Sequence, residues 1–207
     1  MNPRESIAAT LAALAPSEPF GLFLRHAERE EFPQTDPYSD VELTAAGWSS
    51  AAELGKRTAS LLSWVAISPF RRCRQTARLL HPGAPEEDNR LGAPGPWVVD
   101  QTAGEEAFAR LGTAGVVRAQ IQRTPLDAIR GLAEGSALLL SAALERIAAG
   151  RGSGACITHD AVLMPAIHWL TGDPLPDWLQ PLDGMAIQRQ EDHLVCVWRG
   201  RLHPLKP

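Results

Sequence analysis

The sequence predicts an α/β fold built on a mostly parallel sheet. Short apolar runs at residues 21–24, 64–67 and 155–158 have the length and composition of buried strands. Helical patterns separate these runs, and strands that are joined through helices are normally parallel with right-handed crossovers. The 207 residues are enough for one domain of this class with a sizeable core. We therefore expect a single domain over residues 1–207.

The elements of the first half follow from their apolar spacing and their turn residues. Thr44 is the expected N-cap of one helix, and Ser68-Pro69 is expected to cap and start another, because proline is tolerated in the first helical turn. That second helix places Arg72 in its first turn and Thr76 on the same face. A long polar loop, 27–42, follows the first strand, and a loop of this length is often functional. The predicted helices are 1–15, 45–62 and 69–80.

The elements of the second half are predicted in the same way. Residues 97–99 have the pattern of a short strand, and 103–123 that of a helix broken at Gly112 and Gly115. Two alternating runs, 185–190 and 193–198, predict a hairpin. The remaining helices are predicted over 125–149 and 161–170. Four tryptophans are expected in the core: Trp48, Trp64, Trp97 and Trp169.

The composition excludes several classes of protein. Hydrophobic residues make up 44% of the chain and charged residues 21%, which is typical of soluble globular proteins. A formal net charge of -4 argues against a nucleic-acid partner, and no apolar run is long enough to span a bilayer. Cys73, Cys156 and Cys196 are odd in number and far apart, which predicts reduced thiols in a cytoplasmic protein. These features do not determine the oligomeric state.

Polar side chains follow the three predicted strands directly. Arg25-His26 comes after the first, Ser68 to Arg72 after the second, and His159-Asp160 after the third. Because parallel strands end at a common edge, and open α/β sheets bind ligands there, we expect these groups to form one site.

The residue types at this edge suit phosphoryl transfer. Two guanidinium groups, Arg25 and Arg72, can hold a tetrahedral dianion by charge-assisted hydrogen bonds. An imidazole can attack phosphorus, and the cations should lower the pKa of His26 and keep it neutral. Asp160 can protonate the leaving oxygen. This chemistry needs no cofactor and no metal.

Four stretches in this order resemble the histidine phosphatase superfamily, which includes the phosphoglycerate mutase-like proteins and the histidine acid phosphatases. They are Leu24–Ala27, Leu43–Gly47, Ser68–Ala77 and Thr158–Asp160, and the resemblance covers residues 20–172.

The resemblance implies a fold and a set of roles. The fold is a three-layer α/β/α sandwich with a mostly parallel central sheet. His26 would become phosphorylated, while Arg25, Arg72 and His159 would form the phosphate pocket.

The proton donor departs from the pattern of many small members, which have a glutamate in a segment corresponding to residues 90–98. This chain has Gly92 there, whereas Asp160 resembles the acid of the acid-phosphatase and phytase branch. Asp160 could instead be the N-cap of the helix predicted from Ala161. Glu105 and Glu106 are the alternative acids, or else carboxylates that face a helix dipole.

Three functions remain open. The first is a phosphatase acting on a small-molecule phosphoester or a phosphoprotein, the second a phosphoglycerate mutase-type transferase, and the third a non-catalytic phosphate-binding module. Specificity is expected to come from loop 27–42 and from a helical segment around 100–135. Arg29, Glu30 and Glu31 are expected in a solvated charged loop, with gating of the pocket as the alternative.

Overall fold

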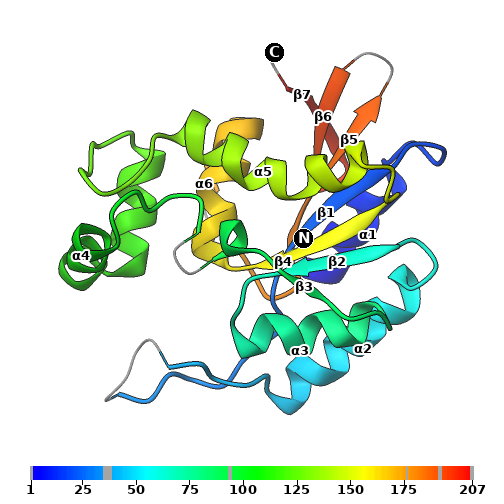
Figure 1. Ribbon diagram of the computed structural model, residues 1–207, viewed down its shortest axis with the longest axis horizontal. Helices are drawn as coiled ribbons and strands as arrows, with labels where there is room; N and C mark the ends of the chain where they lie inside the picture. The colour runs from blue at the N-terminus through cyan, green and yellow to red at the C-terminus, as the bar shows by residue number, and fades with distance from the viewer. Residues whose placement is uncertain (1, 35–38, 93–94, 176, 191–192, 206–207) are drawn as a thin grey trace.

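The computed structural model describes residues 2–34, 39–92, 95–175, 177–190 and 193–205. Its centre is a seven-stranded sheet in the order β3-β2-β4-β1-β5-β6-β7 (Figure 1). Strands β3, β2, β4 and β1 are parallel neighbours, whereas β5, β6 and β7 each run antiparallel to the preceding strand in that order. The strands are β1 Phe20–Arg25, β2 Trp64–Ile67, β3 Glu86–Glu87, β4 Gly154–Thr158, β5 Gly184–Gln190, β6 His193–Trp198 and β7 Arg201–Pro204.

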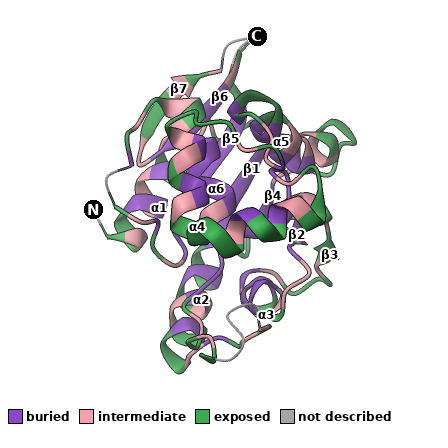
Figure 2. Ribbon diagram, turned by 90° about the vertical axis from the view of Figure 1, so that its left-hand side faces the viewer, coloured by how far each residue is buried: buried purple, intermediate pink, exposed green. Residues whose placement is uncertain are grey.

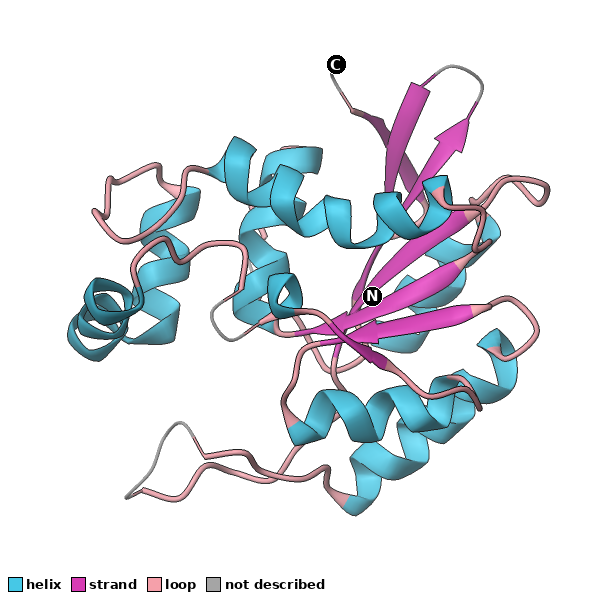
Figure 3. Ribbon diagram, viewed as in Figure 1, coloured by secondary structure: helices cyan, strands magenta, loops and turns pink. Residues whose placement is uncertain are grey.

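Helices cover both faces of the sheet, as Figure 3 shows. They are α1 Pro3–Ala12, α2 Ala45–Thr58, α3 Arg71–Leu80, α4 Gln101–Ile121, α5 Leu132–Ala148 and α6 Asp160–Thr171, with a short 3-10 turn at Asn89–Leu91. None of the described helices is long and apolar enough to cross a membrane. The predicted α/β architecture with a parallel core is confirmed.

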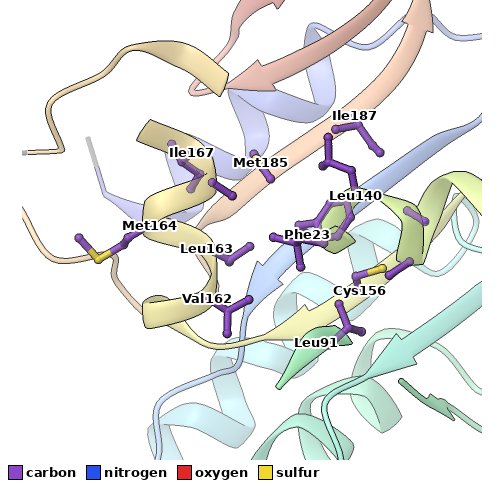
Figure 4. Close-up of a cluster of buried hydrophobic side chains, with 14 of the residues drawn as sticks. Phe23, Leu91, Leu140, Cys156, Val162, Leu163, Met164, Ile167, Met185 and Ile187 are labelled. Carbon is purple, nitrogen blue, oxygen red and sulfur yellow. The ribbon is translucent and has the colours of Figure 1, made fainter. Parts of the chain in front are cut away.

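Each face of the sheet has its own hydrophobic cluster, because successive strand residues point to opposite sides. Phe23 packs toward α5 and α6, where it meets residues such as Leu163 (Figure 4). Leu22 and Leu24 pack toward α1, α2 and α3. Burial therefore concentrates in the sheet between two helical layers, as Figure 2 shows. Cys73, Cys156 and Cys196 are free and buried.

Local signals place several boundaries where the sequence predicts them. Thr44 caps α2 by accepting a 3.0 Å hydrogen bond from the Gly47 amide. Gly172 ends α6 in a left-handed conformation, which glycine adopts without steric cost. Gly112 has φ +65° and kinks α4, whereas the predicted break at Gly115 is wrong, since that residue stays helical.

The predictions for 97–99 and 125–131 are wrong, for one shared reason. The backbones of the two segments pair with each other: the Val99 amide donates to the Ala128 carbonyl (2.9 Å) and the Arg130 amide to the Trp97 carbonyl (2.7 Å). Residues 125–131 therefore do not form the first turns of the helix predicted over 125–149, and α5 begins at Leu132. Only an isolated bridge joins Val98 and Ile129.

Other differences are smaller. Helix α3 begins at Arg71, with Phe70 as its N-cap, two residues later than predicted. Strands β3 and β7 are not among the strands that the sequence predicts. Trp64 and Trp97 are buried as expected, but Trp48 and Trp169 are 39% and 40% exposed, because each lies beside the buried stripe of its helix.

Candidate active site

The carboxyl ends of β1, β2 and β4 bring the predicted residues together. The parallel register pairs Arg25 with Thr158 and Ile67 with Ile157, so the residues that follow meet at one edge of the sheet. The His26 amide continues this pairing by donating to the Thr158 carbonyl at 2.9 Å. Loop 27–42 begins at the same edge, although its residues 35–38 lie outside the described part of the chain.

His26 is buried, and its two ring nitrogens have different partners. Nδ1 lies 2.7 Å from the Ala27 carbonyl oxygen, which can only accept, so Nδ1 carries the proton. Nε2 is then the acceptor, and it receives a 3.2 Å hydrogen bond from Arg72 Nε. Burial, together with the charges of Arg72 and Arg25, lowers the pKa of His26 well below 6.5. The ring is therefore neutral, with its lone pair on the nitrogen that faces Arg72.

Arg72 joins this ring to a second histidine. Its Nη2 lies 3.3 Å from Nδ1 of His159, and the two imidazole centroids are 5.4 Å apart. Because a guanidinium group only donates, His159 must accept at Nδ1, and its Nε2 donates to Ser68 Oγ at 2.8 Å. Burial, and with it the charge of Arg72, lowers the pKa of His159 well below 6.5. The two histidines therefore have opposite tautomers.

Arg25 lies on the other side of the site and forms an ion pair with Asp160 at 2.9 Å. Its guanidinium also donates to the Leu179 carbonyl. The Asp160 carboxylate accepts two further hydrogen bonds, from Trp178 Nε1 (2.8 Å) and from the Ala161 amide (2.7 Å). Helix α6 begins at Asp160 with His159 as its N-cap, so the alternative that Asp160 is the N-cap is wrong.

Both arginines retain unused donors. Arg25 Nε and Arg72 Nη1 are buried without a hydrogen-bond partner among the described residues. An Asp40 carboxylate oxygen lies 3.9 Å from Arg72 Nη1, beyond hydrogen-bond distance. Buried, unpaired donors on cations are costly, and a tetrahedral anion beside His26 would satisfy them. No cluster of three or more potential metal ligands of the His, Cys, Asp or Glu type occurs among the described residues.

The other predicted acids lie elsewhere. Glu105 and Glu106 are exposed on α4, where Glu105 accepts a hydrogen bond from Gln101. The segment that corresponds to the glutamate-bearing segment of many small members does reach the site. A Cβ added at Gly92 would lie 2.6 Å from Ser68 Oγ and 2.8 Å from the His159 ring. Asp160 is therefore the predicted acid that contacts a cation of the site.

Sequence reasoning missed several contacts that shape the site. The sequence predicts Ser68 as a helix cap, but in the structure its hydroxyl bonds His159. No sequence feature predicts the hydrogen bond from Trp178 to Asp160. The Phe70 ring lies 5.3 Å from that of His159 and 4.5 Å from the Arg72 guanidinium carbon. Asp40 belongs to loop 27–42, whose length predicts a functional role, but no feature of the sequence predicts its position opposite Arg72.

Within the segment 100–135, which the sequence marks for specificity, residues between 120 and 134 line a separate groove of about 560 Å³ together with Trp169. None of the strand-end residues lines this groove. A role of the segment in specificity stays a prediction.

Comparisons with known proteins agree with this geometry. Residues 22–92 match the family model of the histidine phosphatase superfamily, branch 1. The predicted resemblance is confirmed. No curated protein matches the chain by sequence.

Solved structures with the same fold cover most of the chain. YhfR of Bacillus stearothermophilus is 19% identical, with TM-score 0.62, over 87% of this chain and 96% of that one. A phosphoglycerate mutase from Bacillus anthracis is 13% identical, with TM-score 0.59, over 86% and 90%. A phosphoserine phosphatase mutant from Entamoeba histolytica, in complex with phosphoserine, is 14% identical, with TM-score 0.55, over 89% and 96%. At these low identities the TM-scores show a shared fold alone, that of the phosphoglycerate mutase-like proteins.

Proposed function

We propose that the protein is a phosphatase that hydrolyses phosphomonoesters through a phosphohistidine intermediate on His26. The observation that carries the proposal is the state of His26, a neutral ring with protonated Nδ1 and an acceptor at Nε2, between two arginines with unused donors. The family match and the phosphatases among the structures of the same fold support an enzyme of this superfamily.

The proposed reaction uses the site residues in two steps. Arg25 and Arg72 bind the phosphoryl oxygens, and the anion draws the Arg72 guanidinium away from His26 Nε2. Nε2 then attacks phosphorus, the bond to the leaving oxygen breaks, and that oxygen takes a proton. Water next attacks the phosphohistidine and gives a proton to the Asp160 carboxylate; the N–P bond breaks, which releases inorganic phosphate and restores His26. His159 donates to Ser68 and accepts from Arg72, so it would act on the charge that develops on the phosphoryl group by holding that guanidinium in position.

Asp160 is the proposed proton donor. Its carboxylate is paired with Arg25, a proposed phosphate ligand, so phosphate binding would compete for the same guanidinium. A carboxylate next to a bound dianion binds a proton more readily, because a like charge disfavours ionisation. The proton that it donates would complete cleavage of an alkyl ester, while an aryl leaving group needs less help.

The Asp160→Asn variant tests this role. We expect turnover of an alkyl phosphate to fall by about 10²-fold, within the range of general acid catalysis, and that of an activated aryl phosphate to change much less. Steady-state kinetics on both esters measure the difference. Unchanged alkyl-phosphate turnover, with a large loss in Glu105→Gln or Glu106→Gln, would move the acid to α4.

Rapid quench with labelled substrate tests the proposed function itself. We expect label on His26, release of inorganic phosphate from a generic aryl phosphate, and activity that persists in EDTA. Interconversion of phosphoglycerates that requires a bisphosphate primer would instead show a mutase. Phosphate binding without turnover of any ester would show a binding module, and label on Ser68 or a cysteine would overturn the mechanism.

A further inference from the structure

The groove of about 560 Å³ lies between the end of α4, the start of α5 and Trp169 of α6. Its volume is within the range of small-molecule sites. The apolar part of its wall comes from Leu126, Ile129, Leu132 and Trp169, and Trp169 is 40% exposed. None of the residues at the strand ends lines the groove, so a ligand bound here would be distinct from the substrate of the proposed active site.

Arg123 places a cation on this wall. Its guanidinium carbon lies 5.4 Å from the centre of the Trp169 ring, and it forms no ion pair within the described part of the chain. Arg123 follows Gln122, the C-cap of α4, and has φ +57°, in the left-handed region that glycine usually occupies after a helix. Glycine would avoid the steric cost of this conformation, so the stability of the turn does not explain the arginine.

Gln120 contributes a buried donor to the same wall. It lines the groove and is 6% exposed, and its Nε2 has no hydrogen-bond partner among the residues that the structure describes. Burial of an unpaired amide donor is costly, and an acceptor in the groove would offset that cost.

The N-terminus of α5 forms another part of the wall, through residues 131–134. Gly131 is the N-cap and has no side-chain acceptor to offer. The Gly135 amide makes the first backbone bond of the helix, to the Gly131 carbonyl, and the amides of residues 132–134 have no partner in the described ranges. A helix end of this kind favours an anion.

The charged side chains of the wall balance one another. Arg130 forms an ion pair with Glu134 at 2.8 Å, and Arg123 and Asp127 are the other two charged residues of the lining. A dianion such as a phosphate ester would be repelled by Asp127 and would have one cation to bind, whereas a singly charged anion is matched by Arg123 and the helix end. The apolar wall and the exposed indole favour an aromatic body on that anion.

We propose that this groove binds a small aromatic carboxylate. The ring of the ligand would pack against Trp169 and the aliphatic side chains. Its carboxylate would accept hydrogen bonds from the Gln120 amide and the Arg123 guanidinium, beside the first amides of α5. This inference goes beyond the proposed function and does not depend on it.

A matched pair of probes tests the site. Phenylacetate and phenylacetamide share a ring and a methylene group and differ in charge. We expect the wild type to bind phenylacetate about 10-fold more tightly, because hydrogen bonds to a charged group are the stronger ones. Titrations followed by nitrogen-15 NMR give both dissociation constants. Phenylacetate should also shift the indole signal of Trp169, which is identified by its loss in Trp169→Phe.

Two variants of Arg123 separate binding from stability. Arg123→Met should bring the ratio of the two dissociation constants close to one. Arg123→Gly should do the same and, without ligand, raise the midpoint of thermal unfolding by about 2 °C, because glycine relieves the left-handed strain. A residue with a merely structural role would not give these opposite effects on binding and stability.

Arg118→Met is the matched control, because Arg118 is exposed on α4 and does not line the groove, and it should leave the ratio unchanged. An indole signal of Trp169 that phenylacetate does not move would overturn the site. Equal affinity of the wild type for the two probes, or the wild-type ratio in Arg123→Met, would overturn it as well.

Discussion

The ends of β1 and β4 form two neighbouring histidine positions with the same surroundings and different hydrogen bonds. His26 is buried and His159 is partly buried; both receive a donor from Arg72, and burial lowers the pKa of both. His26 Nδ1 donates to the carbonyl of the next residue, Ala27, so Nε2 is the nitrogen that accepts from Arg72. His159 accepts at Nδ1 and uses its Nε2 proton on Ser68.

The difference shows how two similar imidazoles acquire different capacities. The partner of one ring nitrogen determines the tautomer and hence the role of the other nitrogen. The lone pair on His26 Nε2 accepts from Arg72, and a phosphoryl group could take the place of that guanidinium. His159 has both nitrogens occupied, accepting from Arg72 and donating to Ser68, which suits a residue that holds Arg72 in position. In our proposal, the role of nucleophile for His26 and the role of positioning Arg72 for His159 follow from these partners.

The largest expected effect separates the two histidines directly. His26→Ala should remove essentially all turnover, because no other group is placed for covalent transfer. His159→Ala should slow turnover but still form labelled enzyme, since the proposed nucleophile is intact. Rapid-quench labelling of both variants measures this contrast. Labelled enzyme in His26→Ala, with none in His159→Ala, would reverse the two roles.

The cation shared by the two rings should come next in size. Arg72→Ala should lower kcat/KM by about 10²-fold or more, because it removes a donor aimed at the developing charge. Arg72→Lys should recover little, since a lysine has no planar fork to reach both rings. Inhibition by vanadate should weaken in parallel. Full activity in Arg72→Ala would contradict the proposed phosphate pocket.

Ser68 should have a smaller effect, confined to the second histidine. Ser68→Ala removes the acceptor that fixes the His159 tautomer, and a hydrogen bond of this kind is worth about 1 kcal/mol, or roughly fivefold in kcat. Nitrogen-15 NMR of the imidazoles should show a change of tautomer at His159 and none at His26. A loss as large as that of His26→Ala would mean that Ser68 has a more direct role.

The pH dependence should be the mildest effect, and its sign follows from the lowered pKa values. Both histidines are neutral in the folded state above and somewhat below 6.5, so the acidic limb of kcat/KM should lie below that pH. Below an unfolded pKa of about 6.5 the unfolded chain binds protons that the folded chain does not, and the free energy of unfolding should fall. Urea titrations at about pH 7 and pH 5 measure this loss. His26→Asn should reduce it, and an unchanged loss in that variant would show that other groups cause it.

The sequence by itself determined the elements that depend on local patterns. Strand β2 lies at the predicted residues, because its apolar run is bounded by polar residues and a proline. Thr44 caps α2 as predicted, since an N-cap needs only the next turn of backbone. The convergence of Arg25, Arg72 and His159 also followed from the sequence, through the rule that parallel strands end at a common edge.

Only the tertiary structure decided which groups pair across that edge. Residues 125–131 have a helical pattern but pair with 97–99, because a neighbouring backbone offers better-placed partners than the next helical turn. The tautomers of His26 and His159 depend on Ala27 and Ser68, and the sequence does not say which atom a ring will face. The sequence predicts Arg29 as one of several solvated charges. Its place beside Phe32 depends on the packing of its loop against α2 and α3. These contacts join residues distant in sequence, so their geometry exists only once the chain has folded.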